Sequence, residues 1–191
     1  VQHGHDFFAN LGDVYEKLGK KGDHQDELVA FLRERMKQFF LDKKDAHDLV
    51  EMVVSGSLDP YGQLQVLEQV SGFRERDEDG FKLIVETAVR VARLAQKGDG
   101  DDVDSALFEH DVELEVFEML GSIDWDCRAS LAMTTMMAME GLKGFSEVLS
   151  RYFEDVLVMV DDAKVQANRL GVLKQVHAVF SRVGDFERVV V

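Results

Sequence analysis

Proline interrupts helices, and this chain contains a single proline, Pro60, among its 191 residues. Apolar residues recur at three- and four-residue steps through most of the sequence, which is the spacing of one face of an α-helix. Long stretches of this pattern with so few breakers predict an all-α protein, built as a multi-helix bundle. Hydrophobic residues make up 46% of the chain, enough for a globular core.

The apolar pattern predicts eight or nine helices. Asp59 followed by Pro60 marks one start clearly, because a carboxylate can cap the helix and proline fits its first position. Residues 74–80 are expected to form a charged linker. The predicted helices cover residues 6–18, 23–40, 45–55, 60–73, 81–96, 112–120 and 129–142, followed by a C-terminal pair that runs to Val160 and resumes after Asp161 and Asp162.

An acidic segment, residues 97–104 (KGDGDDVD), separates two parts of the chain. It contains two glycines and four aspartates and has no apolar periodicity, so we expect a flexible, solvated loop. The predicted organisation is an N-terminal helical part (1–97), the acidic loop (98–104) and a C-terminal helical part (105–191).

The net charge of −15 disfavours binding of nucleic acid, whose phosphates attract Lys and Arg. Residues 150–191 are an exception, because they hold six basic and six acidic residues and are the part best suited to approach RNA. The single cysteine, Cys127, excludes an internal disulfide and suits a reducing compartment, so we expect a cytoplasmic protein. No apolar run approaches the ~20 residues of a membrane span, no signal peptide is visible, and the start at Val1 suggests part of a longer protein.

Motifs for catalysis or metal binding are not recognisable in the sequence. There is no phosphate-binding loop, no Gly-rich dinucleotide motif, no Glu-x-x-His pair and no serine beside a plausible base. His5 and Asp6 resemble one dipeptide of metal phosphohydrolases, but the further ligands of such a site are missing at helical positions. We therefore predict no catalytic residue and no metal site.

The last predicted helix has a polar side opposite an apolar stripe formed by Leu170, Leu173, Val176, Phe180 and Val183. Three cations lie within about 80° of one another on a helical wheel of 100° per residue, and two amides share their side. These five side chains are Lys164, Asn168, Lys174, Gln175 and Arg182. They could form an RNA-facing strip, with cations for phosphates and amides for base edges, or an ordinary solvated face.

Arg169 falls nearer the apolar side of the same helix. We expect it to form a structural ion pair with Asp161, Asp162 or Glu154. Among the nearby aromatic residues, Tyr152 and Phe186 are the two that could be exposed for stacking on an unpaired base.

Four short motifs occur in a fixed order over the last forty residues. They are Tyr152-Phe153-Glu154-Asp155-Val156-Leu157-Val158-Met159, then Asp161-Asp162, then Asn168-Arg169-Leu170, and finally Val183-Gly184-Asp185-Phe186. In order and spacing this region resembles the C-terminal end of the beta subunit of bacterial-type glycyl-tRNA synthetase. A weaker resemblance covers residues 31–73, so that residues 25–191 together are similar to the family and residues 1–24 stay unassigned.

The resemblance implies a helical anticodon-binding domain of the type shared with arginyl-tRNA synthetase. The Asp-Ala-Leu-Arg signature of that domain reads Ala163-Lys164-Val165-Gln166 here, with Gln166 in place of the arginine. The implied function is tRNA binding in support of ATP-dependent glycylation, with tRNA and the alpha subunit of a heterotetramer as partners. This region would need no cofactor, since ATP and Mg²⁺ act at the alpha-subunit site. The residues implied for RNA binding are Lys164, Asn168, Arg169, Lys174, Gln175 and Arg182.

Two alternatives stay open. One is an acidic helical module that binds proteins and has no RNA role, which the net charge, the methionine-rich segment 129–142 and Gln166 favour. The other is the related domain of an arginyl-tRNA synthetase, which the upstream helix at Asp59-Pro60 disfavours.

Overall fold

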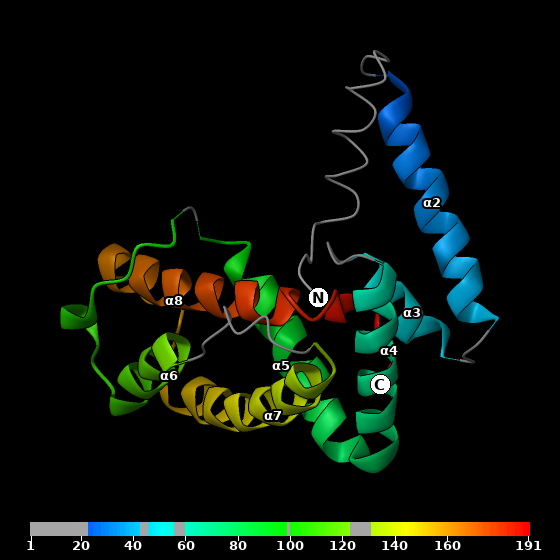
Figure 1. The fold of residues 1–191 in the computed structure, drawn as a ribbon. Helices are drawn as coiled ribbons and strands as arrows, with labels where there is room; N and C mark the ends of the chain where they lie inside the picture. The colour runs from blue at the N-terminus through cyan, green and yellow to red at the C-terminus, as the bar shows by residue number, and fades with distance from the viewer. Residues whose placement is uncertain (1–22, 43–45, 56–59, 99, 123–130) are drawn as a thin grey trace.

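The computed structural model describes residues 23–42, 46–55, 60–98, 100–122 and 131–191, and it confirms the all-α prediction (Figure 1). These residues contain helices and short helical turns, and no strand occurs among them. The elements are α2 (Asp23–Leu41), α3 (His47–Val54), α4 (Pro60–Arg76), α5 (Glu78–Ala95), η1 (Ser105–Leu107), α6 (Asp111–Ser122), α7 (Leu131–Asp155), α8 (Ala163–Ser181) and η2 (Phe186–Arg188).

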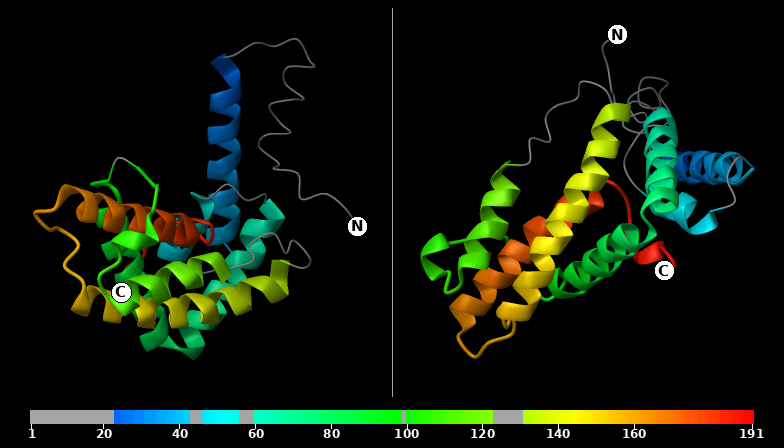
Figure 2. Two further views of the ribbon diagram at one scale, coloured as in Figure 1. Left: turned by 90° about the vertical axis from the view of Figure 1, so that its left-hand side faces the viewer. Right: turned by 90° about the horizontal axis from the view of Figure 1, so that it is seen from below.

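Helix α5 packs on α7 and on α8, and these three helices form the centre of the bundle. In Figure 1, α8 and α7 run above and below α5, with α6 beside them and α4 crossing at the opposite end. The C-terminal turn η2 returns to α3 and α5, so the end of the chain closes the bundle. Helix α2 contacts α3 and projects away from the rest, as both views in Figure 2 show.

One hydrophobic core joins the helices on both sides of the acidic segment. At its centre Phe180 of α8 stacks on Phe145 of α7 with ring centroids 6.2 Å apart, and Phe186 of η2 meets Phe180 edge-on at 5.9 Å. All three rings are buried. The C-terminal segment therefore belongs to the core of the bundle.

Three helix boundaries differ from the sequence prediction. Helix α4 continues to Arg76, and the next residue, Asp77, already caps α5 by accepting a hydrogen bond from the backbone N–H of Gly80, so the expected linker 74–80 does not form. Helix α7 runs through Gly141 and Gly144, where the sequence suggested a break. It then ends at Asp155, five residues before the predicted end.

Packing explains these differences. Leu142, Phe145 and Leu149 are buried along α7, and this burial outweighs the weak helix propensity of the glycines. Beyond Asp155 the chain leaves the helix, yet Val156 and Val158 remain buried. The apolar pattern of that stretch thus reflects a packed connection. The predicted helix 6–18 and the cap at Asp59 lie outside the described residues.

Candidate nucleic-acid interface

Helix α8 carries five of the six residues predicted to bind RNA, and the sixth, Arg182, follows directly as its C-cap. The first turn of α8 is fixed by an N-cap. The side chain of Asp162 accepts hydrogen bonds from the backbone N–H groups of Lys164, at 2.8 Å, and Val165, at 3.2 Å. These two donors, at Val165 and Lys164, hold the pKa of Asp162 below its usual range. The predicted helix start at the acidic pair is confirmed, and the side chain of Lys164 is exposed next to it.

Arg169 is buried at the centre of a charged network. Its Nε donates to Glu113 Oε1 at 2.9 Å, one terminal nitrogen donates to Glu109 Oε2 at 2.7 Å, and the other donates to the carbonyl of Leu157 at 3.1 Å. The arginine side chain is 3% exposed and that of Glu113 is 1% exposed, whereas Glu109 is largely in solvent. The expected structural ion pair is present, but its partners lie in and before α6, not at Asp161, Asp162 or Glu154.

Glu113 also fixes the start of α6. Its Oε2 accepts hydrogen bonds from the backbone N–H groups of Glu109, at 2.8 Å, and His110, at 2.9 Å. Burial by itself would raise the pKa of Glu113, but Arg169 and the two backbone donors together hold that pKa below its usual range. One carboxylate thus links the start of α6 to the middle of α8.

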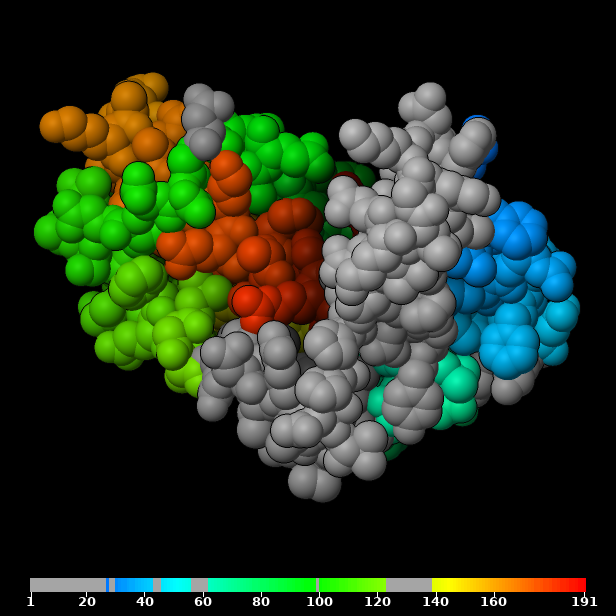
Figure 3. Space-filling model, turned by 45° about the horizontal axis from the view of Figure 1, so that its top comes forward, coloured from blue at the N-terminus to red at the C-terminus, as the bar shows by residue number. Residues whose placement is uncertain are grey.

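The acidic segment lies against the polar side of α8. Asn168, which is buried, donates from Nδ2 to the carbonyl of Asp104 at 3.0 Å and accepts from the N–H of Asp104 at 2.7 Å. Gln175 donates to the carbonyl of Asp101 at 2.9 Å. Figure 3 shows this segment and α6, in green, beside the orange and red surface of α8.

A glycine permits this close approach. A Cβ added at Gly171 would lie 2.8 Å from the carbonyl oxygen of Asp102, which is closer than van der Waals contact allows. Lys174 also faces the segment, with Nζ 3.5 Å from the carbonyl of Gly98. Three side chains expected to face RNA, at positions 168, 174 and 175, therefore hold the acidic segment in place.

The predicted strip is consequently divided. Lys164 and Arg182 are exposed near the two ends of α8, about 27 Å apart at 1.5 Å per residue. Asn168 and Arg169 are buried and bonded within the fold. Contact of the six side chains with RNA stays a prediction.

The two aromatic residues proposed for base stacking are not exposed. Tyr152 has none of its surface accessible and Phe186 only 3%, so the expectation of exposed rings is wrong. Both rings lie in the core, and burial raises the pKa of the Tyr152 hydroxyl, with the negative charge of Glu113 acting in the same direction.

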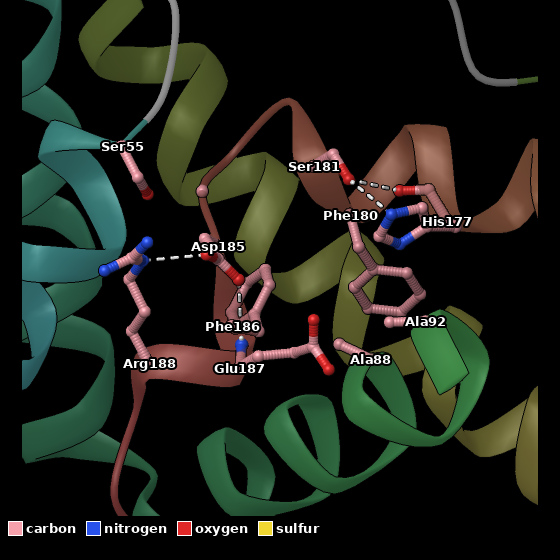
Figure 4. Close-up of a pocket in the computed structure, with 11 residues that line it drawn as sticks. Ser55, Ala88, Ala92, His177, Phe180, Ser181, Asp185, Phe186, Glu187 and Arg188 are labelled. Atoms are coloured by element: carbon pink, nitrogen blue, oxygen red, sulfur yellow. Dashed lines mark hydrogen bonds and ion pairs between the residues drawn. The ribbon is translucent and has the colours of Figure 1, made fainter. Parts of the chain in front are cut away.

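A hollow of about 410 Å³ lies beyond the C-terminal end of α8, between α3, α5 and η2 (Figure 4). Sequence reasoning missed it, because its walls come from three stretches that are far apart in the chain, at Ser55, in α5 and at residues 177–188, and carry no local motif. In this hollow Ser181 Oγ lies 3.4 Å from His177 Nε2. The same hydroxyl donates a hydrogen bond at 2.8 Å to the backbone carbonyl of His177, one helical turn earlier, which is a common bond for a serine in a helix.

The described residues contain neither a candidate metal cluster nor a candidate membrane span. No group of three or more His, Cys, Asp or Glu side chains in this part of the chain is arranged to hold a metal ion. None of the helices there is long and apolar enough to cross a membrane.

Comparison with known proteins places the chain beside one kind of enzyme subunit. It is 29% identical over 185 residues to the glycine–tRNA ligase beta subunit of Lactobacillus helveticus, an alignment that covers 95% of this chain and 26% of that subunit. The subunit of Lacticaseibacillus casei is 29% identical over 190 residues, and that of Streptococcus suis is 33% identical over 166 residues. This chain is a homologue of part of the glycine–tRNA ligase beta subunit. No family model matches it.

The chain spans about a quarter of the length of the beta subunits that it matches, namely 26%, 27% and 23% in the three cases above. The alignments cover 95%, 96% and 86% of this chain. Similarity to the beta subunit thus extends over the acidic segment and the whole of the bundle's centre, well beyond the C-terminal motifs that first suggested it.

Proposed function

We propose that this chain is the tRNA-binding, anticodon-recognising region of a glycine–tRNA ligase beta subunit. The observation that carries the proposal is the similarity to beta subunits over 95% of the chain. In the assembled enzyme the region would support ATP-dependent attachment of glycine to tRNA in the cytoplasm. The alpha subunit would be its partner and would bind ATP and Mg²⁺.

The proposed contribution is positional. A region that holds one end of a tRNA restricts where the acceptor end can reach, and a mismatched anticodon raises the free energy of the docked state. No side chain of this region would take part in the chemical step.

The surface proposed for the RNA is the exposed side of α8, with the cations of Lys164 and Arg182 near its ends. Their separation of about 27 Å spans several nucleotides of an extended single strand. Lys174, Gln175 and Asn168 would reach RNA only after the acidic segment leaves α8, because they contact its backbone. We therefore propose that Lys164 and Arg182 make the main contacts with the RNA.

The test is a titration of the chain with a glycine-accepting tRNA and with the same tRNA carrying replaced anticodon bases, at two salt concentrations. We expect tighter binding of the native anticodon and a logarithmic salt slope of about −0.7 for each phosphate neutralised. Lys164→Ala and Arg182→Ala should each weaken binding and reduce that slope by about one phosphate. Lys82→Ala, which removes an exposed lysine from α5, is the matched control and should have no effect.

Equal weak binding of both tRNAs would move anticodon recognition to another part of the enzyme. Absence of binding at low salt, from a folded chain, would overturn the proposal and favour a helical module that binds a protein. The net charge of −15 and the acidic segment on the polar side of α8 are the observations that favour this second candidate. The arginyl-tRNA synthetase alternative receives no support from the relatives described above.

A further inference from the structure

The hollow beyond α8 has the size of a small-ligand site and a largely apolar floor. Its volume of about 410 Å³ falls within the range of about 300–1,000 Å³ that is typical of such sites. Small side chains of α5 and two core rings form the floor, and polar groups of α3, α8 and η2 surround it (Figure 4). The floor residues are Ala88, Ala92, Phe180 and Phe186.

The charges around this hollow do not cancel. Asp185 Oδ2 accepts a hydrogen bond from Arg188 Nε at 2.8 Å, and Asp185 Oδ1 accepts one from the backbone N–H of Glu187 at 3.2 Å. Arg188 also lies 3.7 Å from Glu51 Oε2. The arginine at the hollow is therefore already occupied by carboxylates.

The carboxylate of Glu187 has no hydrogen-bond or ion-pair partner among the residues that the structure describes. In Figure 4 it projects from η2 into the hollow, below the ring of Phe180. With Asp185 matched by Arg188, Glu187 leaves one excess negative charge in the hollow. Such a site attracts a cation and repels a phosphate.

A guanidinium group fits these features better than an ammonium group. It is planar and can donate two parallel N–H groups to the two oxygens of one carboxylate, while its flat faces rest against an apolar wall. An ammonium is compact and strongly hydrated, so it gains less from an apolar floor. The net charge of −15 also draws basic partners towards the whole chain.

A second hollow adjoins the first and shares Glu187 as a wall. This open groove is lined by apolar side chains of α5 and of the C-terminal segment and by three charged side chains of α5, Glu86, Arg90 and Arg93. The guanidinium of Arg90 lies over the ring of Phe153. Val190 and Val191 are 73% and 57% exposed beside the groove. Apolar side chains that flank a bound arginine would therefore cover exposed valines. The apolar lining consists of Val85, Val89, Leu94, Val189, Val190 and Val191.

We propose that the hollow at Glu187 binds an arginine side chain of a partner protein, whose neighbouring apolar residues cover the valine-lined groove. The hollow adjoins the C-terminal end of α8, where His177 and Ser181 line it, and the proposal does not rest on tRNA binding.

The test uses the isotope-labelled chain, titrated in an NMR experiment with a capped valine–arginine–valine peptide. Peptides with lysine or glutamine at the centre are the comparison ligands. We expect amide shifts that concentrate at residues 185–188 and His177, with the arginine peptide binding at least about fivefold more tightly than the others.

Glu187→Gln should weaken binding of the arginine peptide by about fivefold or more, and Glu187→Lys should abolish that binding. Glu154→Gln removes one exposed carboxylate from α7 and should leave the affinity unchanged. Glu187 is exposed, so both variants at that position are expected to fold, which far-UV circular dichroism checks.

Three outcomes would overturn the proposal. The first is the absence of shifts at residues 185–188 with the arginine peptide. The second is equal affinity of the wild type and Glu187→Gln. The third is binding of guanosine monophosphate that is tighter than binding of the arginine peptide and is lost in Glu187→Gln. Guanine also offers two adjacent N–H donors, so this result would assign the site to RNA.

Discussion

Replacing Arg169 by alanine tests whether this residue serves the fold or the RNA. The change leaves the Glu113 carboxylate, 1% exposed, without its cation, and it also removes the hydrogen bond to the carbonyl of Leu157. Removing one partner of a buried ion pair lowers the free energy of unfolding by on the order of 3–5 kcal/mol. At roughly 2–4 °C per kcal/mol for a chain of this size, the melting temperature should fall by about 6–20 °C. Thermal unfolding followed by circular dichroism measures the change.

Two further variants make the test decisive. Glu109→Gln removes only the solvent-exposed partner, so its effect should stay below about 1 kcal/mol. The double variant Arg169→Met with Glu113→Gln replaces the buried pair by neutral side chains of similar size, keeps an acceptor for the backbone N–H groups of Glu109 and His110, and should recover much of the stability. A melting temperature of Arg169→Ala close to that of the wild type would refute the structural role. A stable double variant that loses tRNA binding would instead assign Arg169 to the RNA.

Three more predictions concern the contacts of α8. Gly171→Ala should lower the free energy of unfolding, measured in urea, by about 1–3 kcal/mol, because the added Cβ would meet a backbone carbonyl. Gly141→Ala has open space around the added Cβ and should raise the free energy of unfolding by about 0.5–1 kcal/mol. The pKa of Glu113 in the folded chain lies below the unfolded value of 4.5. Its contribution to the free energy of unfolding is therefore complete above pH 4.5 and disappears as the pH falls through the folded pKa. Below pH 4.5 the urea midpoint of the wild type should fall faster than that of Glu113→Gln. Asn168→Asp removes the N–H group that donates to the Asp104 carbonyl but keeps the oxygen that accepts from the Asp104 N–H, and it should cost about 1–3 kcal/mol; an unchanged urea midpoint would contradict this.

Sequence reasoning predicted the helices that have a continuous apolar face. The predicted helices 23–40, 81–96 and 112–120 correspond to α2, α5 and α6, because a long run with a period near 3.6 fits one kind of element. Residues 156–160 show where the same reasoning fails. Val156 and Val158 are buried in the connection after α7, and a short apolar run looks alike in a helix and in a packed loop.

The candidate site was predicted in part. The sequence placed Lys164, Lys174 and Arg182 on the polar side of α8, since residue spacing fixes which side chains share one side of a helix. It could not show that the acidic segment covers the middle of that side. Gln175 and Asp101 are far apart in the chain, and composition alone describes such a segment as a solvated loop.

The sequence by itself determined that the chain is helical, where most helices lie and that Arg169 needs a carboxylate partner, because these properties follow from local periodicity and from the cost of an unpaired buried charge. The tertiary structure alone decided which carboxylate that is, Glu113, 56 residues away in the sequence. It also decided that Glu187 lies at a hollow built from three stretches that are far apart in the chain. Contacts of this kind depend on how the helices pack, and local spacing carries no record of that packing.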